Sequence, residues 1–67
     1  MDSLSNTSGR LFKISEAAEM LSISRSLLYE LVRAGRVKTV HIGSAVRVRA
    51  TELERFVAEL TEEAANE

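Results

Sequence analysis

Apolar residues recur at helical spacing in three separate segments of the chain. The first segment consists of Ile14, Ala17, Ala18 and Leu21. It predicts a short helix from Glu16 to about Leu21. Ser15 comes directly before that helix, where its hydroxyl would accept a hydrogen bond from a free backbone N–H one turn later, so we expect Ser15 to be the N-cap. The preceding residues 11–14 are either a short strand or an apolar lead-in.

The second apolar segment follows closely and predicts a helix that ends at a glycine. Its buried stripe is expected to consist of Leu27, Leu28, Leu31 and Val32. Ser24 is the expected N-cap, and Ile23 and Leu28 have the spacing of a hydrophobic staple, which sets the angle of entry into a helix. Gly35 should end the helix, because glycine adopts the left-handed conformation at low cost. The two helices are therefore joined by a tight turn.

Two alternating segments after Gly35 predict a β-hairpin. Valine or isoleucine alternates with polar or basic residues in both of them, which are Val37–Ile42 and Val46–Arg49. The link between them, residues 43–45, contains a glycine. We expect one polar and basic face and one apolar face, the latter formed by Val40, Ile42, Val46 and Val48.

The third helical segment is predicted to begin with a capping box formed by Thr51 and Glu54. Its apolar stripe consists of Leu53, Phe56, Val57 and Leu60. This stripe should pack over the hairpin, with Phe56 at the centre of the contact. Beyond Leu60 the chain is acidic and is expected to fray. The sequence thus divides into a disordered N-terminal tail at 1–10, one domain at 11–60 and an acidic tail at 61–67.

Composition excludes several kinds of site. A chain of 67 residues has room for one small domain, and it contains no cysteine and a single histidine, His41. Disulfides, thiolate metal sites and a metal site around His41 are excluded, and no His-Asp partner set exists for a nucleophilic serine. No apolar run approaches membrane-spanning length. We therefore expect a cytoplasmic, nucleoid-associated protein that is not an enzyme and uses no cofactor, metal, membrane or small-molecule ligand.

The distribution of charge is more informative than the net charge of −1. Residues 1–50 contain eight Lys/Arg and four Asp/Glu, whereas residues 51–67 contain one Arg and six Glu. From Ile23 to Ala50 there are six basic residues and one acidic residue. The net charge of the whole chain argues against nucleic-acid binding. The basic segment from Ile23 to Ala50, however, favours it.

The basic segment contains the second predicted helix, whose surface opposite the leucines is polar. That surface carries Ser24, Arg25, Ser26, Tyr29, Glu30 and Arg33. A solvated helix surface would look the same, but two short helices joined by a tight turn and followed by a basic hairpin form a DNA-binding unit. In that interpretation, Arg25 makes a bidentate contact with guanine, and Ser24 and Ser26 donate to phosphates or bases. Tyr29 either packs on the sugar-phosphate backbone or is a half-buried edge residue.

The predicted hairpin supplies the remaining candidate contacts with DNA. They are Lys38, His41, Ser44, Arg47 and Arg49. Arg47, Arg49 and Lys38 would clamp phosphates, although exposed strand charge also serves to discourage edge pairing. His41 should face solvent or the DNA backbone. The predicted fold is mostly α with a small β-hairpin, a winged helix-turn-helix.

The segment ISEAAEMLSISRSLLYELVRAGRVKTVHIGSAVRVRATELERFV resembles the excisionase-type helix-turn-helix domains, relatives of the MerR winged-helix regulators. The resemblance rests on Ile-Ser, Glu-Ala-Ala, Leu, Ser-Arg, Tyr, Gly, a valine-rich strand, a second Gly, Arg-Val and a helix led by Leu, and it spans Leu11 to Leu60. Two positions depart from the family. Ser44-Ala45 replaces the arginines that often follow the hairpin glycine, which argues against deep insertion into the minor groove. Glu30 replaces a common basic residue, so Glu30 either accepts from cytosine N4 or pairs with Arg33 or a lysine.

The resemblance implies a sequence-specific protein that binds double-stranded DNA. An excisionase, or recombination directionality factor, binds repeated sites beside an attachment site, bends the DNA and assists an integrase in excision. The implied partners are thus DNA, an integrase and neighbouring copies of the chain. A small MerR-like transcriptional regulator is the alternative within DNA binding. A protein-interaction module that acts through the C-terminal helix is the alternative from another class.

Overall fold

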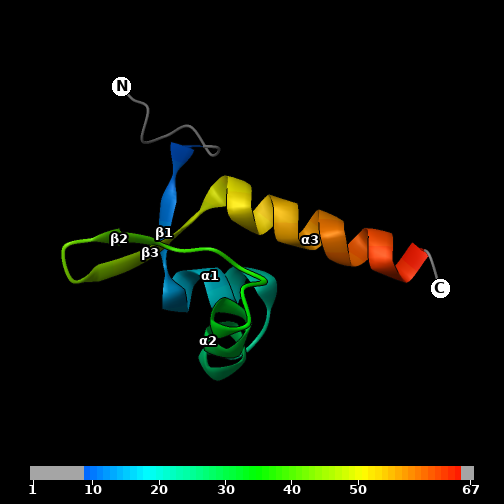
Figure 1. Ribbon diagram of the computed structural model, residues 1–67, viewed down its shortest axis with the longest axis horizontal. Helices are drawn as coiled ribbons and strands as arrows, with labels where there is room; N and C mark the ends of the chain where they lie inside the picture. The colour runs from blue at the N-terminus through cyan, green and yellow to red at the C-terminus, as the bar shows by residue number, and fades with distance from the viewer. Residues whose placement is uncertain (1–8, 66–67) are drawn as a thin grey trace.

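The computed structural model describes residues 9–65 as three helices and a small antiparallel sheet (Figure 1). In chain order the elements are β1 (Leu11–Lys13), α1 (Ile14–Leu21), α2 (Arg25–Arg33), β2 (Val40–Ile42), β3 (Ala45–Arg49) and α3 (Ala50–Ala65). The hairpin of β2 and β3 extends to one side of the molecule, and α3 extends to the other. This is a winged helix-turn-helix, so the predicted fold class is confirmed. Most of the predicted N-terminal tail lies outside the described residues.

The sheet contains a strand that the sequence left undecided. Its order is β1-β3-β2, with β3 antiparallel to both neighbours. Phe12 of β1 lies opposite Val48 of β3, and both side chains are buried. Residues 11–13 are therefore a paired strand rather than a lead-in, and the wing is anchored to the N-terminal part of the domain.

The predicted pairing of apolar faces in the hairpin is wrong. The turn consists of Gly43 and Ser44 alone, and Ala45 belongs to β3. Ile42 consequently pairs with Ala45, and Val40 pairs with Arg47. Shifting a strand by one residue moves all its side chains to the opposite face. Val40 and Ile42 therefore share a sheet face with Arg47 rather than with Val48, and Ile42 is 56% exposed.

A two-residue turn is consistent with the backbone at Gly43. Its φ is +61°, whereas the φ of Ser44 is not positive. A glycine with positive φ followed by a residue with negative φ is typical of a type II′ turn, whose twist matches that of the flanking strands. Gly43, which helped to predict the hairpin, therefore also allows a turn of two residues in place of the predicted link of three.

The hydrophobic core lies between the inner face of the sheet and the three helices. It consists of Phe12, Ile14, Ala17, Ala18, Leu28, Val37, Val48, Ala50, Leu53 and Phe56. Three residues that the helical stripes placed in the core are substantially exposed: Leu27, Val57 and Leu60. The core of so short a chain is narrow, so each helix buries only the centre of its apolar stripe. Leu31, Val32 and the staple residue Ile23 pack against the core from partly buried positions.

Both ends of α2, the second helix of the helix-turn-helix unit, have the predicted geometry. The Ser24 hydroxyl accepts a hydrogen bond from the Leu27 N–H at 3.1 Å, so the predicted N-cap of α2 is confirmed. Gly35 has φ +79°, and the N–H groups of Gly35 and Arg36 donate to the carbonyls of Val32 and Leu31. These two bonds form a Schellman motif, which ends α2 as predicted.

The end of α1 has the same kind of geometry without a glycine. Ser22 has φ +59°, and its N–H donates to the Glu19 carbonyl at 3.0 Å, while the Ile23 N–H donates to the Ala18 carbonyl at 3.0 Å. This left-handed residue turns the chain from α1 into α2. A serine there is conformationally costly, but the turn between the two helices requires that backbone.

Ser15 is not the N-cap of α1, contrary to the sequence prediction. The helix begins one residue earlier, at Ile14, directly after β1. Lys13 takes the cap position, and its N–H donates to the Glu16 carboxylate at 2.8 Å. The pairing of Lys13 with Arg47 in the sheet fixes the chain at that point, so the strand rather than the serine decides where the helix starts.

The predicted ends of the third helix are also wrong. α3 begins at Ala50, immediately after β3, and Thr51 and Glu54 do not form a capping box within it. Instead, the Ala50 N–H donates to the Arg10 carbonyl at 2.9 Å. The helix does not fray after Leu60 but continues to Ala65.

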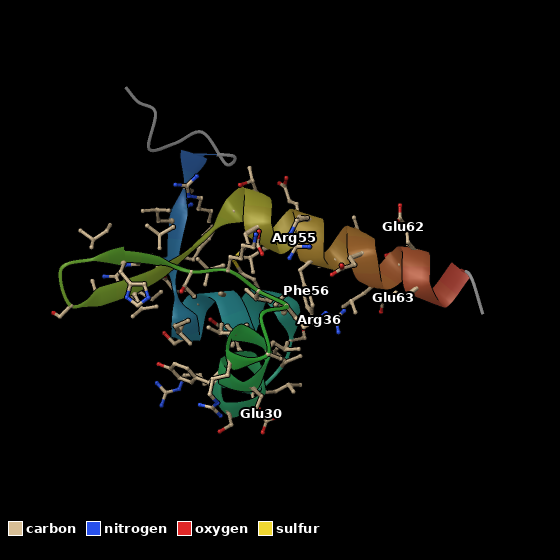
Figure 2. All side chains as sticks on the ribbon, viewed as in Figure 1. Glu30, Arg36, Arg55, Phe56, Glu62 and Glu63 are labelled. Carbon is tan, nitrogen blue, oxygen red and sulfur yellow. The ribbon has the colours of Figure 1, made fainter. Side chains whose placement is uncertain are left out.

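Two arginines hold α3 against the loop that follows α2. Arg55 donates to the carboxylate of Glu52 at 2.7 Å and to the Arg36 carbonyl at 2.7 Å. The Arg36 guanidinium lies over the ring of Phe56 and forms ion pairs with Glu59 at 3.7 Å and Glu63 at 3.3 Å. In Figure 2, Glu63 lies on the side of α3 that faces Arg36, whereas Glu62 points away from the body. Part of the acidic end is therefore paired within the domain.

The carboxylate of Glu52 is the centre of this network. Its side chain is only 13% exposed, and it also accepts a hydrogen bond from the Lys38 N–H at 2.9 Å. The hydrogen bond from Arg55, helped by the bond from Lys38, lowers the pKa of Glu52 even though partial burial opposes this. The ionised form of Glu52 therefore stabilises the contact between α3 and the loop.

Phe56→Ala should destabilise the domain much more than Val57→Ala. The Phe56 side chain is buried, and its removal leaves a cavity costing about 3–5 kcal/mol. Val57 is 45% exposed, so its truncation should cost less than about 1 kcal/mol. Urea unfolding followed by circular dichroism measures both. Equal losses would show that α3 buries a different side against the core.

Glu52→Gln should destabilise the domain by about 1–2 kcal/mol near neutral pH, because a charged hydrogen bond is lost. The pKa of Glu52 is lowered in the folded state, so its contribution is present above the ordinary carboxyl range and disappears as the pH falls below it. The free-energy difference between variant and parent should therefore shrink in acid. Glu54→Gln is the control, since Glu54 is exposed. A difference that does not change with pH would contradict the role of the ionised Glu52.

Candidate nucleic-acid interface

A polar groove separates the start of α2 from the wing. It has a volume of about 380 Å³, and its polar and charged lining residues are Lys13, Ser15, Arg25, Tyr29, Ser44 and Arg47. Ile14, Ala45 and Val46 complete the lining. Three of these residues are basic and none is acidic. The groove is therefore suited to an anion that reaches α2 and the wing at the same time.

Helix α2 supplies Arg25 and Tyr29 to this groove. They are one turn apart, so they project from the same side of the helix, and both are exposed. Arg25 is the first residue of α2, directly after the Ser24 cap. The N–H groups of a first helical turn carry partial positive charge, which adds to the attraction of the arginine for phosphate.

The wing supplies Ser44 and Arg47. Ser44 lies in the two-residue turn, and Arg47 lies in the middle of β3. One guanidinium nitrogen of Arg47, Nη1, donates to the Val46 carbonyl at 2.9 Å, and the residue is partly buried. This bond orients the guanidinium beside the groove, which reduces the entropy lost when Arg47 binds an anion.

The other predicted contact residues do not line the groove. Ser24, Ser26, Glu30 and Arg33 are exposed on or beside α2. Figure 2 shows Glu30 on the side of α2 that points away from α3. Within residues 9–65 Glu30 forms no ion pair, so the pairing with Arg33 or a lysine is not observed there. The roles of all four residues in DNA binding stay predictions.

Three predicted wing residues also lie outside the groove. The His41 ring of β2 approaches the hydroxyl of Thr39, the residue before β2, at 3.4 Å. Lys38 and Arg49 line a separate hollow together with Val40, which lies opposite Arg47 in the sheet. Arg47 and Arg49 are only two residues apart, yet only Arg47 reaches the side of α2.

Sequence reasoning missed Lys13 and Ser15 as candidates. Lys13 comes beside α2 because β1 pairs with β3, which places Lys13 opposite Arg47. Ser15 is free to face the groove because it is the second residue of α1 rather than its cap. Lys13 and Arg47 are far apart in the chain, so no local sequence pattern reveals that they are neighbours. Only the pairing of β1 with β3 shows it.

A family model described as a helix-turn-helix domain matches residues 11–61. The chain belongs to this helix-turn-helix family. Comparisons with curated proteins and with solved structures gave no match. The match covers α1, α2, the wing and most of α3, and it makes DNA the partner of this helix-turn-helix domain. None of the helices in the described part of the chain is long and apolar enough to cross a bilayer.

Arg47→Gln should reduce the salt dependence of DNA binding, whereas Arg49→Gln should not. Each phosphate contact contributes about 0.9 to the slope of log affinity against log salt, so losing one should lower the slope by about one. Fluorescence anisotropy on a short duplex with a single site, measured between low and moderate salt, gives both slopes. The two variants remove the same kind of side chain from one strand. If the two variants show equal slopes, then lining the groove does not decide which of the two arginines contacts a phosphate.

Proposed function

We propose that this helix-turn-helix domain binds DNA sequence-specifically, with α2 in the major groove and a backbone phosphate seated between α2 and the wing. The observation that carries the proposal is the polar groove, which brings Arg25 and Tyr29 of α2 together with Ser44 and Arg47 of the wing. A helix of this width fits the major groove, and its N-terminal residues then meet the base edges.

Within this arrangement the residues have different tasks. Arg47 and Lys13 neutralise the phosphate, and Tyr29 packs on the sugar-phosphate backbone. Arg25 extends from the first turn of α2 to the O6 and N7 atoms of a guanine, where its planar fork makes two hydrogen bonds. Phosphate contacts set the position of the domain on the duplex, and the base contact supplies the sequence preference.

Glu30 and Arg33 contribute at the far end of α2. A carboxylate close to DNA repels phosphate, and Glu30 has no ion pair within residues 9–65. Its acceptance of a hydrogen bond from the N4 amino group of cytosine removes that penalty and adds specificity. Arg33 is placed one turn from Tyr29, where it meets a phosphate on the next stretch of backbone.

The biological task that we propose is that of an excisionase-type directionality factor. The support is the resemblance of the sequence to such domains over Leu11–Leu60, together with the winged helix-turn-helix fold. In this role the protein occupies repeated sites beside an attachment site, bends the DNA and favours excision by an integrase. It acts without enzymatic activity of its own, and its partners are DNA, the integrase and neighbouring copies.

Arg25→Ala should lower affinity for a selected site by about 1–3 kcal/mol and broaden the sequence preference, because a bidentate base contact is lost. The site is obtained first by selection from a random duplex pool, and binding is measured on it and on unrelated DNA. Arg33→Ala is the comparison, since it removes the same kind of side chain from the same helix, and the loss of its phosphate contact should weaken binding to both DNAs alike. Equal losses on both DNAs for Arg25→Ala would make Arg25 a phosphate contact only.

The parent and the Arg25→Ala variant also separate the excisionase role from its alternative. Excision of a substrate by a candidate partner integrase should be stimulated by the parent and less by Arg25→Ala. Bending of the DNA should appear in a circular-permutation gel assay. A protein that leaves excision unchanged but alters transcription from a promoter carrying the selected site is a MerR-like regulator instead. That outcome would contradict the proposed excisionase role but not the proposed binding to DNA.

A further inference from the structure

A loop of residues 34–39 connects α2 to β2 of the wing. Because α2 and the wing both line the polar groove, the path of this loop affects the gap between them. Val37 anchors the middle of the loop, since its side chain is 1% exposed and belongs to the core. The backbone on each side of Val37 is bonded to α3. Helix α3 therefore acts on the segment that joins the two parts of the candidate DNA interface.

The bonds from α3 to the loop are made by Glu52 and Arg55, which we name the loop clamp. Oε2 of Glu52 accepts a hydrogen bond from the Lys38 N–H at 2.9 Å. Nη2 of Arg55 donates to the Arg36 carbonyl at 2.7 Å and to the Glu52 carboxylate at 2.7 Å. One turn of α3 is thus linked to the loop backbone both before and after its buried residue.

The loop clamp constrains the path of the chain rather than the position of one side chain, because it bonds to backbone atoms. Hydrogen bonds with one charged partner are stronger than neutral ones, and Glu52 is only 13% exposed, which limits competition from water. The ion pairs of Arg36 with Glu59 and Glu63 join exposed side chains, and such pairs contribute little. The path of the loop therefore depends more on the clamp than on those ion pairs.

The loop clamp lies outside the polar groove. Glu52 and Arg55 line a separate hollow whose other residues are Gly35, Arg36, Lys38 and Glu59. This hollow and the groove share no residue. An effect of the clamp on DNA binding must therefore pass through the loop or arise from charge, and the opposite charges of the two residues allow these causes to be separated.

The outer part of the wing depends on β2, which begins two residues after Lys38. β1 pairs with β3 only from Arg47 to Arg49, whereas Ala45 and Val46 pair with β2 alone. The Val46 carbonyl accepts the hydrogen bond from Nη1 of Arg47 and so orients that guanidinium. A shift of the loop is thus passed through β2 to the residue that orients Arg47.

We propose that the loop clamp positions the outer wing for DNA binding, so that the Arg47 guanidinium meets a backbone phosphate while Arg25 of α2 reaches a base. The path runs from Glu52 and Arg55 through the loop to β2, and then through the Val46 carbonyl to Arg47. Glu52 and Arg55 are therefore positioning residues rather than DNA contacts. This role rests on the proposed function, because the phosphate contact of Arg47 is what the clamp sets.

Alanine substitution of each clamp residue separates positioning from charge. Glu52→Ala removes a negative charge and Arg55→Ala removes a positive one, so a direct effect of charge on DNA affinity would differ in sign. Loss of positioning should instead weaken binding to a single selected site in both variants, by about twofold to thirtyfold. Fluorescence anisotropy measures the affinities at a temperature where thermal unfolding shows each variant to be folded.

Glu59→Gln is the matched control for the two alanine variants. It removes a negative charge from the same side of α3 and the ion pairs with Arg36 and Arg55, but no bond to the loop backbone. Its affinity for the selected site should therefore change little. If Arg55→Ala does not fold, Arg55→Lys replaces it, because lysine keeps the charge but lacks the planar fork that reaches Glu52 and the Arg36 carbonyl together.

Combination with Arg47→Gln tests whether the clamp acts through the wing. In the parent, Arg47→Gln should lower the slope of log affinity against log salt by about one. In the Arg55→Ala background the decrease should be much smaller, since the guanidinium no longer meets its phosphate. Arg25→Ala should keep its effect in that background, because α2 itself is not displaced. Residues that act independently would instead give additive losses.

Residual dipolar couplings of the backbone N–H groups measure the orientation of the outer wing relative to α2 in the free protein. Both alanine variants should change the couplings of residues 42–46 relative to those of α2, and Glu59→Gln should not. This measurement needs no DNA. A parent protein without sequence-specific binding would therefore contradict the proposed function, and the couplings would still decide whether the clamp sets the wing.

Three results would overturn this role of the loop clamp. In the first, the couplings of the outer wing are the same in the parent and in both alanine variants. In the second, Glu52→Ala strengthens binding while Arg55→Ala weakens it, which would assign the effect to charge. In the third, Arg47→Gln lowers the salt slope equally in both backgrounds, which would make the clamp a contact for stability only.

Discussion

Phe12 and Val48 lie opposite each other across β1 and β3, and the orientation of every helix depends on that buried pair. β1 ends at Lys13 and α1 begins at the next residue, while β3 ends at Arg49 and α3 begins at the next residue. No linker separates strand from helix in either case, so the sheet fixes the direction in which both helices leave it. α2 then follows from α1 through the left-handed Ser22. The groove between α2 and the wing is a consequence of these short connections.

The electrostatic character of the domain also follows from pairing rather than from composition. The net charge of −1 says nothing about DNA binding, because acidic and basic residues are separated in space. Arg36 and Arg55 pair with Glu52, Glu59 and Glu63 along one side of α3. Lys13, Arg25 and Arg47 gather in a groove whose lining has no acidic residue. A groove of this charge attracts anions, and such attraction weakens as the salt concentration rises.

The narrow core leaves several apolar side chains at the surface of the molecule. The core is too small to cover all the apolar residues of the helices, so Met20, Val57 and Leu60 remain at the surface. The short hairpin turn likewise leaves Ile42 exposed opposite Ala45 instead of over the core.

Much of this protein was determined by local sequence alone. The helical stripes, the Ser24 cap, Gly35 and the alternating valines predict two helices, a wing and a third helix, because helix propensity, capping and turn chemistry act over a few residues. The exposed positions of Arg25 and Tyr29 on α2 follow from the same periodicity. The predicted class of fold was right for this reason.

Only the tertiary structure decided which of these residues come together. Pairing of β1 with β3 overrides Ser15 as a cap and brings Lys13 beside Arg47, while the direct passage from β3 into α3 removes the expected capping box at Thr51. A turn shorter by one residue moves Ile42 to the other face of the sheet. These outcomes depend on contacts between residues distant in the chain and on how much apolar surface one small core can cover, and neither is encoded in a local pattern.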